Sequence, residues 1–372
     1  MIPLAKIFST AHDSFFYLSS FIFIISIIVF IHEYGHYVVA KICNVKIEAF
    51  SIGFGPELFG IKDKSGTRWK FSLIPIGGYV KMFGDANVAS TGASTSDLTA
   101  EEKLVAFYEK SLLQKFCIAF AGPLANLLFA IVVLTVFFSV QGVMHPMAVI
   151  GKVEPNSVAE RAGLVAGDII LKVNNHDVKW FTDIQKYIIE NGNKKLSIQY
   201  LRQNVQNTVT IYPEMRTIRK LQIPFLGISA SQLRQDYQLQ KLSVTSAFIS
   251  SSIYTYNLIC TTLTAIWQMI TGQRSINELG GPIQIAKYSG YSVKNNEVLW
   301  FMGMISINLG VINLLPIPML DGGHMLQYTI QGILRRKHIS AKFQNYAAVL
   351  GFILLLFLMI FATLNDIKAI LK

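Results

Sequence analysis

The stretch SIIVFIHEYGHYVVAK (Ser26–Lys41) places two histidines and a glutamate inside an apolar run. Residues 15–29 are nearly all apolar, and His32, Glu33 and His36 follow before the run has ended. An ionised carboxylate near the middle of a membrane helix costs roughly 2.5–3.5 kcal/mol on insertion scales. The rest of the sequence must therefore supply something that offsets this cost.

The composition indicates a membrane protein. Of the 372 residues, 52% are hydrophobic and only 15% are charged, which is too apolar for an ordinary soluble domain. The net charge of +11 comes from dispersed basic residues without a basic, aromatic stripe, so we expect an anionic lipid surface and no nucleic acid. Cys43, Cys117 and Cys260 lie far apart without CxxC spacing, which predicts neither a disulfide framework nor a thiolate zinc site.

Four apolar segments are long enough to be predicted as transmembrane helices, approximately residues 15–39, 116–140, 298–315 and 346–364. The first exceeds the apolar length of a secretory signal and no small-residue cleavage site follows it, so we expect it to remain in the protein. A fifth stretch, residues 242–272, is rich in Ser, Thr and Tyr, which favours an amphipathic helix on the membrane face over a further crossing.

Basic residues predict the orientation. RRKHISAK (residues 335–342) carries four basic residues in eight between the third and fourth spans, so this loop should be cytoplasmic. Counting crossings backward places the basic loop 41–115 on the same side. Both termini and the segment between the second and third spans then lie outside, in the periplasm of a Gram-negative cell.

Residues 144–236 have the composition of a soluble module. VEPNSVAERAGLVAGDIILKVNNHDV (Val153–Val178) reads as strand, short helix, turn and strand, and it resembles a PDZ domain in the run from Ala162 to Val173. The length fits one α+β domain of this kind. Such a domain binds an extended peptide along a sheet edge, although the module could instead only limit how bulky a partner approaches the membrane.

His32 and His36 are one helical turn apart, so both imidazoles can reach one ion. Glu33 lies beside them, close enough to contact a metal-bound water. Catalytic zinc takes three protein ligands and keeps one open position. The alternative is a pair of interfacial histidines in an accidental HExxH.

A third ligand is predicted in NLGVINLLPIPMLDGGH (Asn308–His324). The two prolines end the third span and the two glycines permit a tight backbone, so we expect Asp321 on an irregular segment, residues 316–324, at membrane depth. Asp321 is the preferred ligand. His324 is the second candidate, with a supporting or loop role as its alternative.

Residues 46–83 read as two aromatic-rich strands around the turn KDKSG. A transmembrane helix hides its peptide bonds, so a substrate must unwind before cleavage, and a free strand edge could satisfy its exposed amides. We expect Gly77, Gly78 and Tyr79 to contact substrate there. A hairpin with only a packing function is the alternative, and GPLAN (residues 122–126) could likewise be a kinked packing helix or a gate.

Together, HEYGH, GFGP, IPIGGYVKM, FAGPLANLL, the single inserted PDZ module and NLLPIPMLDGGH resemble the site-2 protease family of intramembrane zinc metalloproteases, in its bacterial regulator of sigma-E protease branch. The resemblance implies a bacterial inner-membrane protein with Zn²⁺ held by His32, His36 and Asp321 and with Glu33 as general base. It assigns Asn313, and more weakly Asn308, to substrate binding, and it describes the hairpin as a membrane-reentrant loop.

We therefore expect an α-helical polytopic membrane protein with four transmembrane helices, a membrane-associated β-hairpin and one PDZ domain, organised as residues 1–143, 144–236 and 237–372. The implied activity is regulated intramembrane proteolysis of single-pass membrane proteins, such as anti-sigma factors or remnant signal peptides, after an upstream site-1-type protease has acted. A non-proteolytic PDZ membrane scaffold and a metal transporter are the alternatives.

Overall fold

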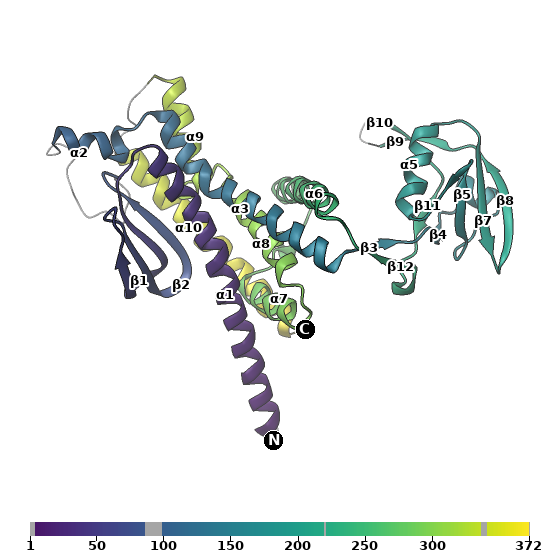
Figure 1. The fold of residues 1–372 in the computed structure, drawn as a ribbon, viewed down its shortest axis with the longest axis horizontal. Helices are drawn as coiled ribbons and strands as arrows, with labels where there is room; N and C mark the ends of the chain where they lie inside the picture. Colours follow the sequence, from purple (N-terminus) through teal and green to yellow (C-terminus); the bar gives the residue numbers. More distant parts are fainter. Residues whose placement is uncertain (1–3, 86–98, 219–220, 336–340, 372) are drawn as a thin grey trace. The chain divides into compact units, whose positions relative to one another are not determined.

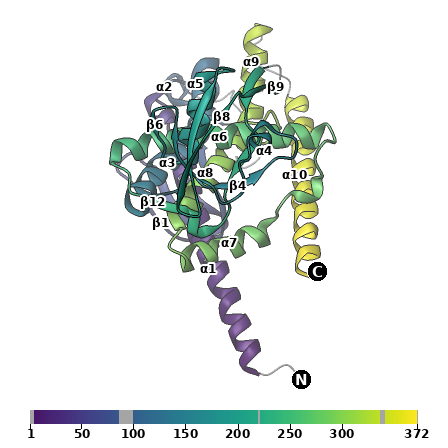
Figure 2. The ribbon, with the colours of Figure 1, turned by 90° about the vertical axis from the view of Figure 1, so that its right-hand side faces the viewer.

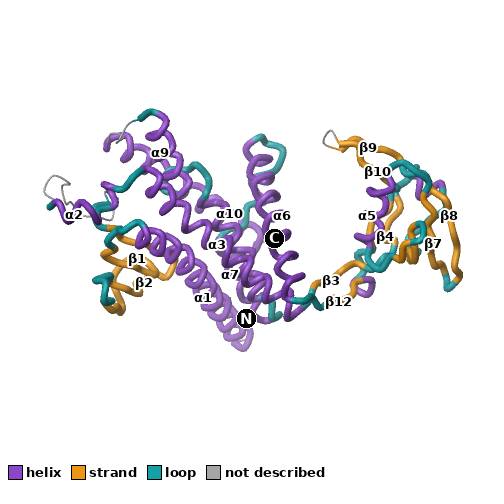
Figure 3. The backbone as a smooth tube through the Cα atoms, turned by 45° about the horizontal axis from the view of Figure 1, so that its top comes forward, coloured by secondary structure: helices purple, strands orange, loops and turns teal. Residues whose placement is uncertain are grey.

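The structure is a computed structural model that describes residues 4–85, 99–218, 221–335 and 341–371 (Figure 1). The chain forms two compact units. One combines Met1–Phe137 with Val244–Lys372, and the other is Phe138–Ser243. Figure 3 shows that the first unit is mainly helical, whereas strands dominate the second.

The first unit contains a β-hairpin and eight described α-helices. In chain order its elements are α1 (Leu4–Ile42), β1 (Ile47–Lys62), β2 (Arg68–Met82), α2 (Ala100–Val105), α3 (Leu112–Gln141), α6 (Val244–Ile270), α7 (Pro282–Lys294), α8 (Val298–Asn313), α9 (Asp321–Ile333) and α10 (Ala341–Leu371). Figure 2 shows α10 running to the C-terminus.

Helix α1 carries the HEYGH motif. No proline or glycine occurs between Leu4 and Tyr34, so nothing interrupts its backbone hydrogen bonds. The helix ends where Asn44 adopts a left-handed backbone with φ 54° and donates its N–H to the carbonyl of Lys41. The motif therefore lies on a continuous helix.

Among the described residues, three helices are long and apolar enough to cross a membrane, namely Asp13–Ile42, Leu112–Gln141 and Asn345–Leu371. Helix α8 is apolar but has only 16 residues, fewer than the roughly 20 that a perpendicular crossing needs. The helices and the hairpin agree with a membrane protein of the predicted class. The count of four crossings stays a prediction.

Strands β1 and β2 pair along their length, from Ile47 opposite Met82 to Lys62 opposite Arg68. The ladder is irregular, and Phe50 pairs with both Val80 and Trp69, so the long strands curl into a small sheet. The turn is closed by the Asp63 carboxylate, which accepts the N–H groups of the residues two and four positions later.

The structure corrects the expectation for residues 316–324. The backbone is irregular only as far as Leu320, because helix α9 begins at Asp321. An acidic side chain in a first turn complements the partial positive charge of a helix N-terminus, and this favours the early start.

Helix α7 was not predicted from the sequence. Gly281 at its N-cap offers no side chain, and the cap comes from α10 instead. The buried carboxylate of Asp366 accepts the backbone N–H groups of Gly281, Ile283 and Gln284 at 2.8, 3.0 and 3.1 Å.

The second unit has its own hydrophobic core. Its elements are β3 (Val143–Pro146), β4 (Ile150–Val153), α4 (Val158–Arg161), β5 (Ile169–Val173), β6 (His176–Asp177), α5 (Phe181–Asn191), β7 (Leu196–Arg202), β8 (Val205–Ile211), β9 (Glu214–Ile218), β10 (Leu221–Phe225), β11 (Ile228–Ala230) and β12 (Tyr237–Gln240). Antiparallel strands in the order β6-β5-β7-β8 form its main sheet. The strand, helix and strand read from Val153–Val178 occur as the end of β4, α4 and β5.

Candidate metal centre

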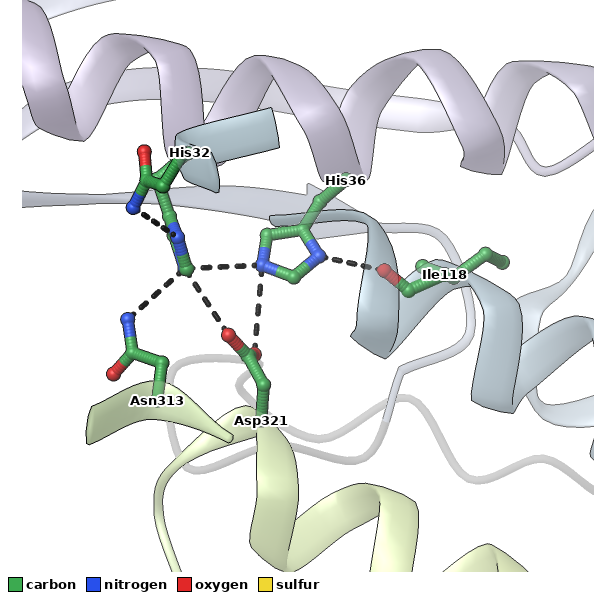
Figure 4. Close-up of polar contacts among 6 residues, drawn as sticks. His32, His36, Ile118, Asn313 and Asp321 are labelled. Atoms are coloured by element: carbon green, nitrogen blue, oxygen red, sulfur yellow. Dashed lines mark hydrogen bonds and ion pairs between the residues drawn. The ribbon is translucent and has the colours of Figure 1, made fainter. Parts of the chain in front are cut away.

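Three side chains from two distant parts of the chain converge at one point (Figure 4). Nε2 of His32 lies 3.1 Å from Oδ2 of Asp321, and Nε2 of His36 lies 3.4 Å from Oδ1 of the same carboxylate. The two Nε2 atoms are 3.3 Å apart. Helix α1 supplies both histidines at the predicted one-turn spacing, and the first turn of α9 supplies the aspartate.

Helix α3 contacts both histidine rings through the nitrogen that does not face Asp321. Nδ1 of His36 donates a hydrogen bond to the carbonyl of Ile118 at 2.7 Å (Figure 4). Nδ1 of His32 lies 3.1 Å from Nδ2 of Asn126. Each ring thus contacts α3 through one nitrogen and turns the other toward Asp321.

Glu33 lies beside this cluster and against the hairpin. Its carboxylate lies near the backbone of Val80 in β2. The strand can approach because residue 78 is glycine: a Cβ there would lie 3.0 Å from Cγ of Glu33 and 2.7 Å from the carbonyl oxygen of Ser51. Glu33 is therefore held next to the histidines without joining the three-residue cluster.

A cavity of about 420 Å³ opens onto the cluster. Among the predicted site residues, its lining includes His32, Glu33, His36, Gly77, Gly78, Tyr79, Asn313, Asp321 and His324. Nδ2 of Asn313 lies 3.4 Å from Nε2 of His32 (Figure 4). A group bound in the cavity can thus reach the cluster, the glutamate, the amide and the edge of β2 together.

Two residues that were predicted for the site lie outside the three-residue cluster. The structure does not bring Asn308 to the cavity, because its Oδ1 accepts a hydrogen bond from Thr262 of α6 and its Nδ2 donates to the carbonyl of Met304. His324 lines the cavity but lies outside the three-residue cluster, and its ring stacks on Tyr328.

The cluster has the chemistry of a divalent transition-metal site. One donor atom from each of His32, His36 and Asp321 lies within 4.8 Å of the others. Two imidazoles and one carboxylate are the donor set of catalytic zinc sites with an open position. A carboxylate and two imidazoles brought this close in an apolar setting would also be stabilised by a shared cation.

Two residues that contact the histidines, Ile118 and Asn126, are not predicted as site residues from the sequence. The signal for Asn126 was present in GPLAN, a polar side chain within an apolar span, but it was interpreted only as packing or gating. Ile118 contributes a backbone carbonyl, which no side-chain pattern can reveal.

Comparisons with known proteins cover nearly the whole chain. The model of peptidase family M50 matches residues 20–358. A Rickettsia conorii protein that carries the name zinc metalloprotease is 42% identical over 359 residues, spanning 94% of this chain and 97% of the relative. The metalloprotease MmpA of Caulobacter vibrioides is 31% identical over 384 residues, spanning 94% and 95%.

One solved structure resembles part of the chain. The PDZ domain of the SdrC-like protein from Listeria monocytogenes matches 24% of this chain and 90% of that domain, with 20% identity and a TM-score of 0.21. A likeness at this level carries no argument, so the PDZ assignment stays a prediction.

Proposed function

Because this chain belongs to peptidase family M50, we propose that it is an intramembrane zinc metalloprotease that cleaves single-pass membrane proteins in or near their spanning helices. The family and the enzyme class predicted from the motifs are confirmed by the family match and by the names of the relatives. The observation that carries the proposal is the convergence of His32, His36 and Asp321 beside Glu33 in one cavity.

His32, His36 and Asp321 would hold the zinc ion. When bound, zinc supplies Lewis-acid activation of water and of the scissile carbonyl. Glu33 takes the proton from the attacking water and later delivers it to the leaving amine. Nδ2 of Asn313, on the same side of the site as Nε2 of His32, donates a hydrogen bond to the developing oxyanion.

The edge of β2 at Gly78, Tyr79 and Val80 would hold the substrate. This segment pairs with β1 on one side and lines the cavity. An unwound substrate segment added there exchanges its internal hydrogen bonds for bonds to the strand, so its amides stay satisfied in a low-dielectric setting. Gly77 and Gly78 allow this segment to pack closely, because a Cβ at Gly77 would lie 2.3 Å from the Phe54 ring and one at Gly78 would lie 3.0 Å from Cγ of Glu33.

The orientation and the substrates extend the proposal. We place the protein in a bacterial inner membrane with loops 41–115 and 335–342 in the cytoplasm and with the termini and residues 144–236 in the periplasm. Substrates are expected to have been shortened first by an upstream site-1-type protease, and anti-sigma factors or remnant signal peptides fit this class. The loop at 335–342 lies largely outside the described residues.

The Glu33→Gln variant tests the proposal. The substitution preserves side-chain size and removes the base, so cleavage of a tagged single-pass substrate by the purified full chain should fall by at least about 10²-fold. Zinc content measured by elemental analysis should stay at the wild-type level, because Glu33 is not a ligand. The matched variant Asp321→Asn should instead lose zinc.

Undiminished cleavage by Glu33→Gln would contradict the proposed role. A wild-type protein that binds zinc and moves it across liposome membranes without cleaving peptides would favour the transporter alternative. A wild-type protein with neither activity would favour the scaffold.

A further inference from the structure

One face of α3 packs against the two histidine rings of the metal centre. Ile118, Gly122 and Asn126 follow one another at four-residue spacing, so they lie along one side of the helix. The first accepts a hydrogen bond from His36 and the last contacts His32. Between them, a Cβ at position 122 would lie 2.3 Å from Nε2 of His36.

The contact between Asn126 and His32 is buried but incompletely satisfied. Asn126 has 0% exposure, and its Nδ2 lies 3.1 Å from Nδ1 of His32. Its Oδ1 has no hydrogen-bond partner among the described residues. A buried polar atom of this kind is expected to have a partner in the working protein.

Metal binding would provide that partner. His32 turns Nε2 toward Asp321 and His36, so this nitrogen is the one available to an ion. An imidazole that coordinates through Nε2 carries its hydrogen on Nδ1, and that hydrogen needs an acceptor. The two orientations of an asparagine amide have nearly the same shape, and turning this one by 180° presents Oδ1 to Nδ1.

We infer that Asn126 is a positioning residue that accepts a hydrogen bond from Nδ1 of His32 and thereby holds Nε2 toward the ion. The inference rests on the proposed zinc site but not on proteolysis. Ser306 of α8 contacts the backbone of this residue and not its side-chain amide, because its hydroxyl donates to the carbonyl of Asn126 at 2.9 Å.

Zinc affinity of the full chain in lipid nanodiscs tests the inference. Metal-stripped protein would be titrated with Zn²⁺ against a chromogenic chelator. Asn126→Leu has similar size but no acceptor, so it should weaken zinc binding about 10–100-fold, the usual effect of losing a partner of a ligating histidine. Asn126→Asp keeps an acceptor and should remain close to the wild type.

The matched control is Ser306→Ala, which removes a buried hydrogen bond to Asn126 without removing a contact to His32. It should leave zinc affinity unchanged. Thermal unfolding with and without zinc distinguishes a positioning role from a role in folding. Asn126→Leu should reduce the rise in Tm that zinc produces by more than it lowers the Tm of the metal-free protein.

Equal zinc affinity in Asn126→Leu and the wild type would overturn the inference, and so would an Asn126→Asp variant as weak as Asn126→Leu. If the leucine variant fails to fold, ¹⁵N spectra of histidine-labelled, zinc-loaded wild type decide the matter. An Nδ1 proton of His32 that exchanges slowly with solvent and correlates with the Asn126 side chain supports the inference, and an Nδ1 proton without that correlation overturns it. A wild type that binds no zinc would remove the proposed function as well, whereas failure at Asn126 alone would leave that function intact.

Discussion

At the scale of single residues, Gly122 leaves no room for a side chain beside the two histidine rings. A Cβ at this position would lie 2.3 Å from Nε2 and 2.6 Å from Cε1 of His36, and 2.9 Å from Cε1 of His32. Both rings are nearly buried, with 8% exposure for each residue, so they have little space into which to move. The absence of a side chain at position 122 is therefore a condition for the ligand geometry.

We predict that Gly122→Ala weakens zinc binding. Overpacking of this kind costs about 1–3 kcal/mol, which corresponds to roughly 5- to 150-fold in affinity if the metal site bears the strain. Chelator competition on the purified chain measures it. Gly332→Ala in α9 is the control, because its Cβ would meet nothing closer than 3.9 Å. Equal affinity in both variants would show that the histidines can shift freely.

The candidate ligands could be predicted because each ionisable residue in an apolar segment needs a physical reason to be there. That reasoning pointed to His32, Glu33, His36 and Asp321, which the structure brings together. The resemblance assigns Asn313, and more weakly Asn308, to substrate binding. Only the packing of α6 against α8 shows that Asn308 turns toward Thr262.

At the scale of elements, helix α7 depends on a residue far away in the sequence. Asp366 of α10 is fully buried and satisfies three N–H groups at the start of α7. Helix α7 in turn packs against α1, the helix that carries both histidines. The last helix of the chain therefore stabilises the surroundings of the first.

We predict that Asp366→Ala loosens α7. Hydrogen bonds to a charged acceptor contribute about 1.5–3 kcal/mol each, and the Gly281 N–H left behind is buried. Hydrogen exchange followed by mass spectrometry should show faster exchange of the amides in Pro282–Lys294. The control is Asp13→Asn, which removes an exposed ion pair to Lys294 and should cost at most about 1 kcal/mol. Unchanged protection in Asp366→Ala would mean that α7 is held by packing alone.

Helix α7 was not predicted because the residue that caps its N-terminus, Asp366, is distant in the sequence. Its sequence PIQIAKYSGYSVK begins with a proline but has no N-cap side chain before it, and it contains a glycine and two serines. The hairpin was easier to predict, because alternating aromatic residues and the KDKSG turn are local signals. The sequence predicts an irregular segment as far as residue 324, because the first residues of α9 include two glycines.

At the scale of the whole molecule, the chain separates into a membrane unit and an inserted unit. The inserted unit has a buried core drawn from its own strands and helices, including Ile150, Leu164, Ile184 and Leu196. Its ends are brought together by the antiparallel pair β3–β12, in which Val143 lies opposite Gln240. Composition predicted this division, because charged residues return after the second apolar span, but it could not predict the pairing that closes the unit.

We predict that residues 143–240 fold without the rest of the chain. A segment of about 100 residues that has its own hydrophobic core and whose ends lie side by side meets the usual conditions for an independent domain. Within it, Asp168 has 0% exposure and accepts hydrogen bonds from Nε and Nη2 of Arg202, both at 2.7 Å. Removing one member of a buried pair costs roughly 3–5 kcal/mol, and the cost should be lower here because the Arg202 side chain is 36% exposed.

Urea unfolding of the fragment and of its Arg202→Met variant provides the measurement. The fragment should unfold in one cooperative transition, and the variant should have a lower midpoint, since it leaves the Asp168 carboxylate buried without its cation. Asp177→Asn is the matched control, because the ion pair with Lys172 is exposed and contributes at most about 1 kcal/mol. A fragment that lacks a cooperative transition would show that the inserted unit needs the membrane unit to fold. Equal midpoints for the two variants would show instead that the Asp168–Arg202 pair contributes no more than a surface contact.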